Sequence, residues 1–190
     1  MKPITPRQTA IVVIDPQVWT FALPLAPRDA NNLAGNIARL CHAFSSKGGV
    51  SIFTRAAFSA GYADMLKQEV DVPLNVPEGG IPEHALAFVP SLHDTPKLVI
   101  TKRQWSAFYG TELDLQLRRR AIDTIVIAGV MTNFGVESTA RDGWQHNYRV
   151  IVAEDACSSL DTSMHQFAME KILPRVSRVM TVDAIVGSCV

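Results

Sequence analysis

Residues 124–142 read Thr124-Ile125-Val126-Ile127-Ala128-Gly129-Val130-Met131-Thr132-Asn133-Phe134-Gly135-Val136-Glu137-Ser138-Thr139-Ala140-Arg141-Asp142, and this stretch decides the fold. Its first five residues form an apolar run without polar alternation, which predicts a parallel strand covered on both faces. The remainder predicts a helix start, because Thr132 or Asn133 can cap it and apolar side chains then recur every four positions. A strand that turns at once into a helix presents backbone N–H groups at the carboxyl edge of the sheet. Such groups can bind an anion or an oxyanion.

The rest of the chain alternates apolar runs with helical patterns. The runs that predict strands are residues 10–14, 50–54, 97–101, 149–153 and about 178–182, and helical spacing occurs at 33–44, 113–120 and about 163–173. This alternation predicts an α/β fold, with a mostly parallel sheet between helices, in one domain of residues 1–190. Right-handed crossovers place the carboxyl ends of the strands on one edge. We therefore expect Asp15, Arg55 and Lys102 to meet there, beside the turn that follows residue 128.

The segment from Ala56 to Pro96 is the least regular part of the chain. It contains prolines at positions 73, 77, 82, 90 and 96, and only Tyr62 to Glu69 shows a weak helical pattern. A connection of this length inside a compact domain is usually functional. We interpret it as a lid, an oligomer contact, or both.

Composition limits the classes of partner. The 190 residues carry 18 Lys+Arg and 18 Asp+Glu, so nothing favours nucleic acid or an anionic membrane surface, and small substrates fit better. Cys41, Cys157 and Cys189 are odd in number and lack paired metal spacing, which predicts a reducing compartment. The N-terminus shows no secretory pattern, and no apolar run approaches the roughly 20 residues of a membrane span. We expect a cytoplasmic protein.

Three segments together resemble the isochorismatase-like or cysteine hydrolases, a family that includes isochorismatases, nicotinamidases and N-carbamoyl amidohydrolases. They are Ile11-Val12-Val13-Ile14-Asp15-Pro16-Gln17, Thr101-Lys102-Arg103-Gln104-Trp105-Ser106-Ala107-Phe108 with Gly110-Thr111, and residues 124–142. The run Thr-Asn-x-Gly-Val-Glu-Ser-Thr is most similar to uncharacterised bacterial isochorismatase-like hydrolases. The resemblance implies a six-stranded parallel α/β/α sandwich without a cofactor, in a homo-oligomer (dimer or tetramer).

Asp15 is the predicted proton-transfer residue. At the end of a buried strand it loses water, which raises its proton affinity, while a nearby Lys102 would lower it. The alternative is that Asp15 caps a turn or only neutralises Lys102. The resemblance favours catalysis, because the family's matching lysine holds the acid and stabilises developing negative charge.

The resemblance also implies the residues around the substrate. Trp105 and Phe108 could form an apolar wall, although aromatics at this spacing are more often core. The turn after residue 128 matches a family turn with a non-proline cis peptide, so we predict cis between Val130 and Met131, with N–H groups around Met131 and Gly135 as an oxyanion hole. The predicted substrate-binding residues are Gln17, Arg55, Trp105, Phe108, Val130, Met131 and Thr132.

Gly135 stands where most of the family has its nucleophilic cysteine. A cysteine hydrolase needs a thiolate to form an acyl-enzyme, and glycine cannot supply one. Ser106, Ser138 and Cys157 are the candidate replacements, each more typical of a structural residue, with Cys157 the best of them.

Hydrolysis of a vinyl ether needs no nucleophilic side chain, because an acid can protonate the vinyl carbon and water completes the reaction. In this family the true isochorismatases work in this way, and they also tend to have glycine at this position. Met131-Thr132-Asn133 and Trp105 differ from the residues that isochorismatases have there, so isochorismate is not assigned as the substrate.

The leading hypothesis is therefore a hydrolase that acts on a small, carboxylated metabolite, with Asp15 as general acid and Arg55 and Lys102 neutralising the carboxylate. The alternative is a catalytically silent member that binds a metabolite or serves as an assembly subunit. A metal site is not expected, because Arg55-Ala56-Ala57-Phe58 follows the second strand and no histidine appears until His84. Five scattered histidines, His42, His84, His93, His146 and His165, are more typical of surfaces or helix ends.

Overall fold

Six parallel strands form one sheet in the computed structural model of this chain, which describes residues 3–73, 77 and 80–190. The order across the sheet is β3-β2-β1-β4-β5-β6. The strands are β1 (Thr9–Ile14), β2 (Val50–Ala56), β3 (Leu98–Lys102), β4 (Thr124–Val130), β5 (Arg149–Ser158) and β6 (Arg178–Met180). The predicted six-stranded α/β sheet is confirmed, and its central strands β1 and β4 are buried along their whole length.

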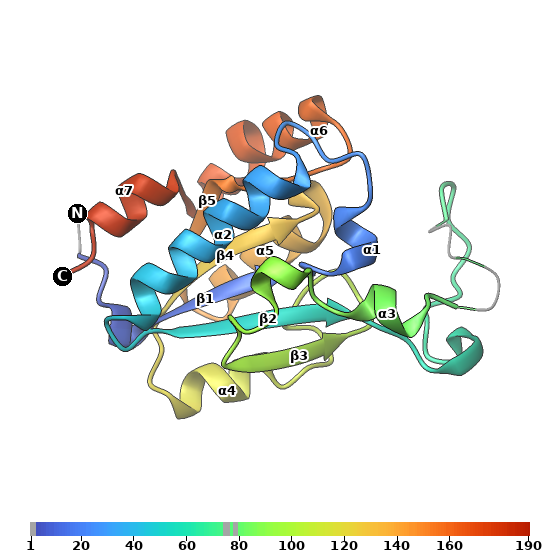
Figure 1. Cartoon of the computed structure of the whole chain (residues 1–190), viewed down its shortest axis with the longest axis horizontal. Coiled ribbons are helices and arrows are strands. Elements are labelled where there is room, and N and C mark those ends of the chain that lie inside the picture. Colours follow the sequence, from blue (N-terminus) through green and yellow to red (C-terminus); the bar gives the residue numbers. More distant parts are fainter. Residues whose placement is uncertain (1–2, 74–76, 78–79) are drawn as a thin grey trace.

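Helices cover both faces of the sheet (Figure 1). The α-helices are α1 (Val18–Phe21), α2 (Ala30–Ser45), α3 (Glu83–Leu86), α4 (Leu113–Arg119), α5 (Glu137–Gln145), α6 (Thr162–Phe167) and α7 (Val182–Gly187). Two π-helical turns span Thr132–Val136 and Ala168–Ile172, and 3-10 turns span Pro6–Gln8, Ala60–Tyr62, Pro90–Leu92 and Leu173–Arg175. Apolar side chains of α2 and α7 fill the core on one face, and those of α4 and α5 help to fill the core on the other. This is the layered arrangement expected when parallel strands are joined by helical crossovers.

The end of β5 differs from the sequence prediction. β5 continues to Ser158, whereas the acidic residues after Ala153 predicted its end. The pairing of β4 with β5 shifts register between Ile127 and Gly129 and then resumes, with Gly129 opposite Cys157. The irregularity accommodates the acidic pair Glu154-Asp155 within the strand. Cys157 therefore lies inside β5 and not beyond it.

Two further expectations are wrong. Strand β6 ends at Met180, because the Thr181 hydroxyl caps α7 by accepting a hydrogen bond from the Ala184 N–H. The weak helical pattern from Tyr62 to Glu69 produces no α-helix, since only the 3-10 turn Ala60–Tyr62 forms there, with a positive φ at Gly61 and at Tyr62.

The described part of the segment between β2 and α3 projects away from the body of the molecule, beyond the ends of β2 and β3 (Figure 1). It is tied to the body by an ion pair in which Arg103 Nε lies 2.7 Å from Asp64 Oδ2. Residues 74–76, 78 and 79, which belong to the predicted lid or oligomer contact, lie outside the described residues. Either role stays a prediction.

Candidate active site

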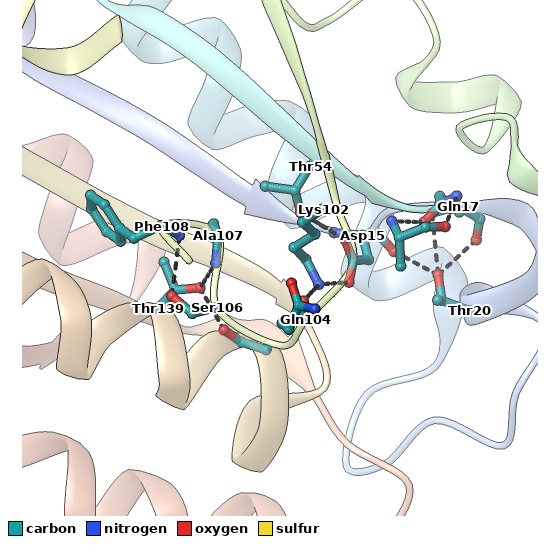
Figure 2. Close-up of polar contacts among 12 residues, drawn as sticks. Asp15, Gln17, Thr20, Thr54, Lys102, Gln104, Ser106, Ala107, Phe108 and Thr139 are labelled. Atoms are coloured by element: carbon teal, nitrogen blue, oxygen red, sulfur yellow. Dashed lines mark hydrogen bonds and ion pairs between the residues drawn. The ribbon is translucent and has the colours of Figure 1, made fainter. Parts of the chain in front are cut away.

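Asp15 and Lys102 form an ion pair at the carboxyl edge of the sheet. Lys102 Nζ lies 2.6 Å from Asp15 Oδ2 and also donates a hydrogen bond to the Gln104 carbonyl (Figure 2). The two residues are 7% and 3% exposed. The pair comes from β1 and β3, and the Thr54 hydroxyl of the intervening β2 donates to Asp15 Oδ1 at 2.7 Å. The structure thus brings together the acid and the lysine that the sequence predicted.

The backbone of Asp15 is held in an unusual conformation. Its φ is 47°, a left-handed value uncommon for residues with a side chain. The Asp15 N–H donates to the Thr54 hydroxyl, and the Asp15 carbonyl accepts from the Thr20 hydroxyl. These two threonines fix the direction of the carboxylate before any substrate arrives.

Gln17 joins the ends of two strands and does not face the ion pair (Figure 2). Its side chain is fully buried, donates to the carbonyls of Ala56 and Leu86, and accepts from the Ala56 N–H. Because the amide has partners on both its nitrogen and its oxygen, Gln17 acts as a joint between the edge of the sheet and α3.

Gly135 is buried in the π-helical turn after β4 and packs against Ile14, the residue before Asp15. A Cβ added there would lie 2.8 Å from Ile14 Cγ2 and 3.4 Å from the carbonyl oxygens of Trp105 and Val130. The position of the family nucleophile is therefore closely packed here. A cysteine could enter only if the branched Ile14 side chain moved.

The Val130-Met131 peptide is cis, as predicted. The predicted helix cap is wrong, because Met131 occupies the N-cap position and no side chain caps the turn. Instead, the Thr132 hydroxyl contacts His165, and Asn133 Oδ1 accepts a hydrogen bond from the Ser159 hydroxyl. Both side chains are directed toward α6 and the end of β5.

The two predicted aromatic residues occupy different environments. Trp105 is 58% exposed, and its ring lies 4.8 Å, centroid to centroid, from that of Phe134 in the turn after β4. Phe108 is buried in the core, stacked on His146 and Tyr148. Only Trp105 is placed to meet a ligand at this edge, with Phe134 as an aromatic neighbour that the sequence did not single out.

The remaining predicted residues are spread over three environments. Val130 is buried in β4, Met131 is half-buried, and Thr132 is fully buried. Arg55 lies on the face of the sheet opposite Thr54, because successive side chains of a strand alternate, and its guanidinium donates to Thr101. There it lines a surface pocket with His93 and Thr101. The structure does not bring Arg55 to the ion pair.

Of the three candidate replacement nucleophiles, Ser138 is half-buried on α5, whereas Cys157 and Ser106 are enclosed. Cys157 is fully buried, and burial raises the pKa of its thiol. Ser106 is buried and accepts a hydrogen bond from the Phe108 N–H. A nucleophile needs access to substrate and a group that takes its proton, and neither side chain has this setting.

His165, for which the sequence suggested a surface or helix-end position, is a buried residue in the last turn of α6. It is 2% exposed, and burial, reinforced by the charge of Arg28, holds its pKa below the ordinary 6.5, while Glu154 acts in the opposite direction. A signal was present, since His165, Ala168 and Met169 share the three-and-four spacing of a buried helix face.

The described residues hold no group of three or more His, Cys, Asp or Glu side chains that could bind a metal ion. Within the same part of the chain, no helix is long and apolar enough to cross a membrane.

Known proteins resemble this chain over most of its length. The isochorismatase domain model matches residues 9–184. The uncharacterized isochorismatase family protein YecD of Escherichia coli O157:H7 is 40% identical over 189 residues, which cover 99% of this chain and 100% of that protein. The structure of an isochorismatase family protein from Burkholderia thailandensis is 37% identical with a TM-score of 0.91, covering 98% of this chain and 97% of that one. The ureidoacrylate amidohydrolase RutB of Methylobacterium radiotolerans is 41% identical over 88 residues, or 45% of this chain and 34% of that protein. The chain therefore belongs to the isochorismatase family, whose members are hydrolases.

Proposed function

We propose that residues 1–190 act as one hydrolase domain on a small metabolite, with Asp15 as the proton-transfer group and no covalent intermediate at position 135. The observation that carries the proposal is the buried 2.6 Å contact between Asp15 and Lys102, together with a glycine, packed against Ile14, where the family nucleophile would stand. A glycine at the nucleophile position leaves reactions in which a proton and a water molecule are sufficient.

Acid-catalysed cleavage of a vinyl ether meets these conditions. Asp15, once it has taken up a proton from solvent, transfers that proton to the terminal vinyl carbon, and an oxocarbenium ion forms. Water adds to the cation, Asp15 takes a proton back, and the adduct breaks into a carbonyl compound and an alcohol. Because Lys102 is already in place, it stabilises the carboxylate that each transfer leaves behind without further reorganisation.

Other residues would bind the substrate. Trp105, with Phe134 beside it, offers an exposed aromatic surface for a planar group. The backbone N–H groups around Met131 and Gly135 would face developing negative charge. With Arg55 on the opposite face, a carboxylate on the substrate would rely on Lys102 for its cation.

Two vinyl ethers test both the reaction and the carboxylate. Hydrolysis of 2-methoxyacrylate gives pyruvate and methanol, and hydrolysis of ethyl vinyl ether gives acetaldehyde and ethanol. We expect turnover of at least one, and Asp15→Asn should reduce kcat by at least 10²-fold, the lower end of the usual contribution of acid–base catalysis. Asp183→Asn, which alters a surface carboxylate paired with Arg39, is the control. Equal activity of Asp15→Asn and wild type would remove Asp15 from the mechanism.

A second candidate is a silent family member that binds a metabolite. The close packing of Ile14 over Gly135 favours it, because that packing blocks the usual acyl-enzyme chemistry. Neither vinyl ether nor amide would then turn over, while a small carboxylate would still bind and quench Trp105 fluorescence. If Gly135→Cys with Ile14→Ala gained amidase activity, the chain would be a disabled cysteine hydrolase.

We also propose a cytoplasmic homo-oligomer, a dimer or tetramer. Three unpaired cysteines suit a reducing compartment. Exposed apolar side chains at Leu66, Val70 and Val72, on the segment that projects from the body, suit a contact with a second copy.

A further inference from the structure

A second polar cluster lies behind the turn that follows β4. The Thr132 hydroxyl is 2.8 Å from His165 Nδ1, and His165 Nε2 is 3.7 Å from Glu154 Oε1. Glu154 also forms an ion pair with Arg28 at 2.9 Å. These side chains come from the turn, from α6, from β5 and from the loop before α2. Thr132 and His165 are 0% and 2% exposed.

We assign the protons of His165 from its charged neighbours, because its Nε2 makes no hydrogen bond within the described residues. Nε2 faces a carboxylate oxygen, which favours a proton on that nitrogen. Nδ1 then carries the lone pair, and the Thr132 hydroxyl donates to it. Burial and the Arg28 charge lower the pKa of His165, which keeps the ring neutral near pH 7 and preserves Nδ1 as an acceptor.

A hydroxyl, an imidazole and a carboxylate in this order also occur in hydrolase triads. Thr132, however, has no exposed surface, and a nucleophile must contact the substrate. The Nε2 to Oε1 distance also exceeds that of a hydrogen bond. The cluster is therefore placed to orient the backbone and not to attack a substrate.

The backbone that it orients lies beside Asp15. Thr132 follows Met131, whose carbonyl accepts hydrogen bonds from the N–H groups of Phe134 and Val136. Gly135, in the same turn, packs against Ile14, the residue before Asp15. One imidazole thus reaches, through a single hydroxyl, the turn that packs against Ile14.

We propose that His165 is a positioning residue that fixes this turn through Thr132, and so sets the geometry opposite Asp15. Its consequence for catalysis rests on the proposed function. Its structural part can be measured on the protein without any substrate, so the two can fail separately.

The structural test uses two direct readouts. ¹⁵N shifts of the imidazole should show the proton on Nε2, and Thr132→Val should change the Nδ1 shift while Thr132→Ser keeps it. With Trp19→Phe and Trp144→Phe as background, acrylamide quenching of Trp105 reports on its neighbour Phe134. His165→Leu should change the quenching constant at least twofold, whereas His165→Asn, which keeps an acceptor near Nδ1, should restore it.

The functional test uses the vinyl ether that the wild type hydrolyses. We expect His165→Leu to reduce kcat at least tenfold with KM within twofold, and His165→Asn to recover most of the loss. Leu117→Ala, a core change on α4, provides a matched loss of stability without touching the turn. Three outcomes would overturn the proposal. The imidazole ¹⁵N shifts could be the same in Thr132→Val and wild type, or His165→Leu could leave the quenching constant unchanged. Leu117→Ala could also reduce kcat as much as His165→Leu does. Absence of turnover in the wild type, with the expected shifts and quenching, would count against the proposed function alone.

Discussion

At the scale of single residues, the site depends on a glycine and a charge pair. Gly135 is packed so closely that even the Cβ of an alanine at this position would be too close to Ile14. Asp15 and Lys102 neutralise each other in a buried position, where neither charge could remain alone at low cost. Both features can be measured through stability, before any substrate is known.

Gly135→Ala should destabilise the protein by about 1–3 kcal/mol, because its Cβ would lie 2.8 Å from Ile14 Cγ2. Gly35→Ala is the matched change, since Gly35 is exposed within α2 and has no atom within 4 Å of a new Cβ. It should stabilise by roughly 0.5–1 kcal/mol through helix propensity. Urea unfolding measures both, and the same sign for the two variants would contradict the packing described here.

Removal of one member of the ion pair should cost more than removal of both. Asp15→Asn or Lys102→Met alone leaves an unpaired group and should lower the free energy of unfolding by about 3 kcal/mol. The double variant should lose less than the sum of the two. Strictly additive losses would mean that the 2.6 Å contact carries no coupling.

At the scale of elements, β1 and β4 pair at their carboxyl ends in a way that leaves no room for a side chain at Gly129. Gly129 pairs with Ile14 and has a φ of 109°, and a Cβ there would lie 2.2 Å from the Ile14 carbonyl oxygen. Only glycine fits this position. The pairing of Gly129 with Ile14 brings the turn that contains Gly135 against Ile14, the residue before Asp15.

The sequence predicted the strands that carry the ion pair because their apolar runs end abruptly at Asp15 and Lys102. It could not predict the interior of β5, where Glu154 and Asp155 look like a loop but remain in the strand through a register shift and contacts with Arg28 and with the N–H of Val182. It also could not place Arg55 or the packing over Gly135. Which face a side chain takes, and what covers it, depend on tertiary partners far away in the sequence.

The strand and helix positions of the cysteines predict their reactivity. Cys157 in β5 and Cys41 in α2 are buried, and burial raises the pKa of Cys41 to about 11. Cys189 is only half-buried. In the native state iodoacetamide should therefore label Cys189 first, and intact mass should show one adduct before any unfolding. Rapid labelling of Cys157 with loss of activity would instead support the hypothesis that Cys157 is the nucleophile.

The position of His165 in α6 predicts a pH dependence of stability. Its folded pKa lies below the ordinary 6.5, so the unfolded chain binds the proton first as the pH falls. The free energy of unfolding should therefore decrease as the pH falls through about 6.5 and on toward the lower, folded pKa. The difference between wild type and His165→Asn, measured from pH 8 to pH 5, isolates this contribution. A difference independent of pH would contradict the shift.

At the scale of the whole molecule, the features that remain open to experiment lie outside the sheet. The sandwich and the location of the site at its carboxyl edge followed from the alternation of elements. The projecting segment between β2 and α3 has no such pattern, because irregular backbone takes its structure from whatever it contacts.

The oligomer is the prediction that belongs to this scale. Light scattering should return a multiple of the 20.8 kDa chain mass, a dimer or a tetramer. Val72→Lys, which places a charge on a side chain 88% exposed in the single chain, should shift the mass toward that of the monomer. A wild-type mass of one chain would exclude the homo-oligomer.

The origin of the ion pair in separate strands has a further consequence. Asp15, Thr54 and Lys102 come from three adjacent strands, and the strand that brings the lysine, β3, lies at the margin. Strands at the edge of a sheet open locally before the central strands do. Enzyme activity should therefore be lost at a denaturant concentration that still leaves most of the circular dichroism signal intact. Activity would then report the opening of β3 earlier than circular dichroism does.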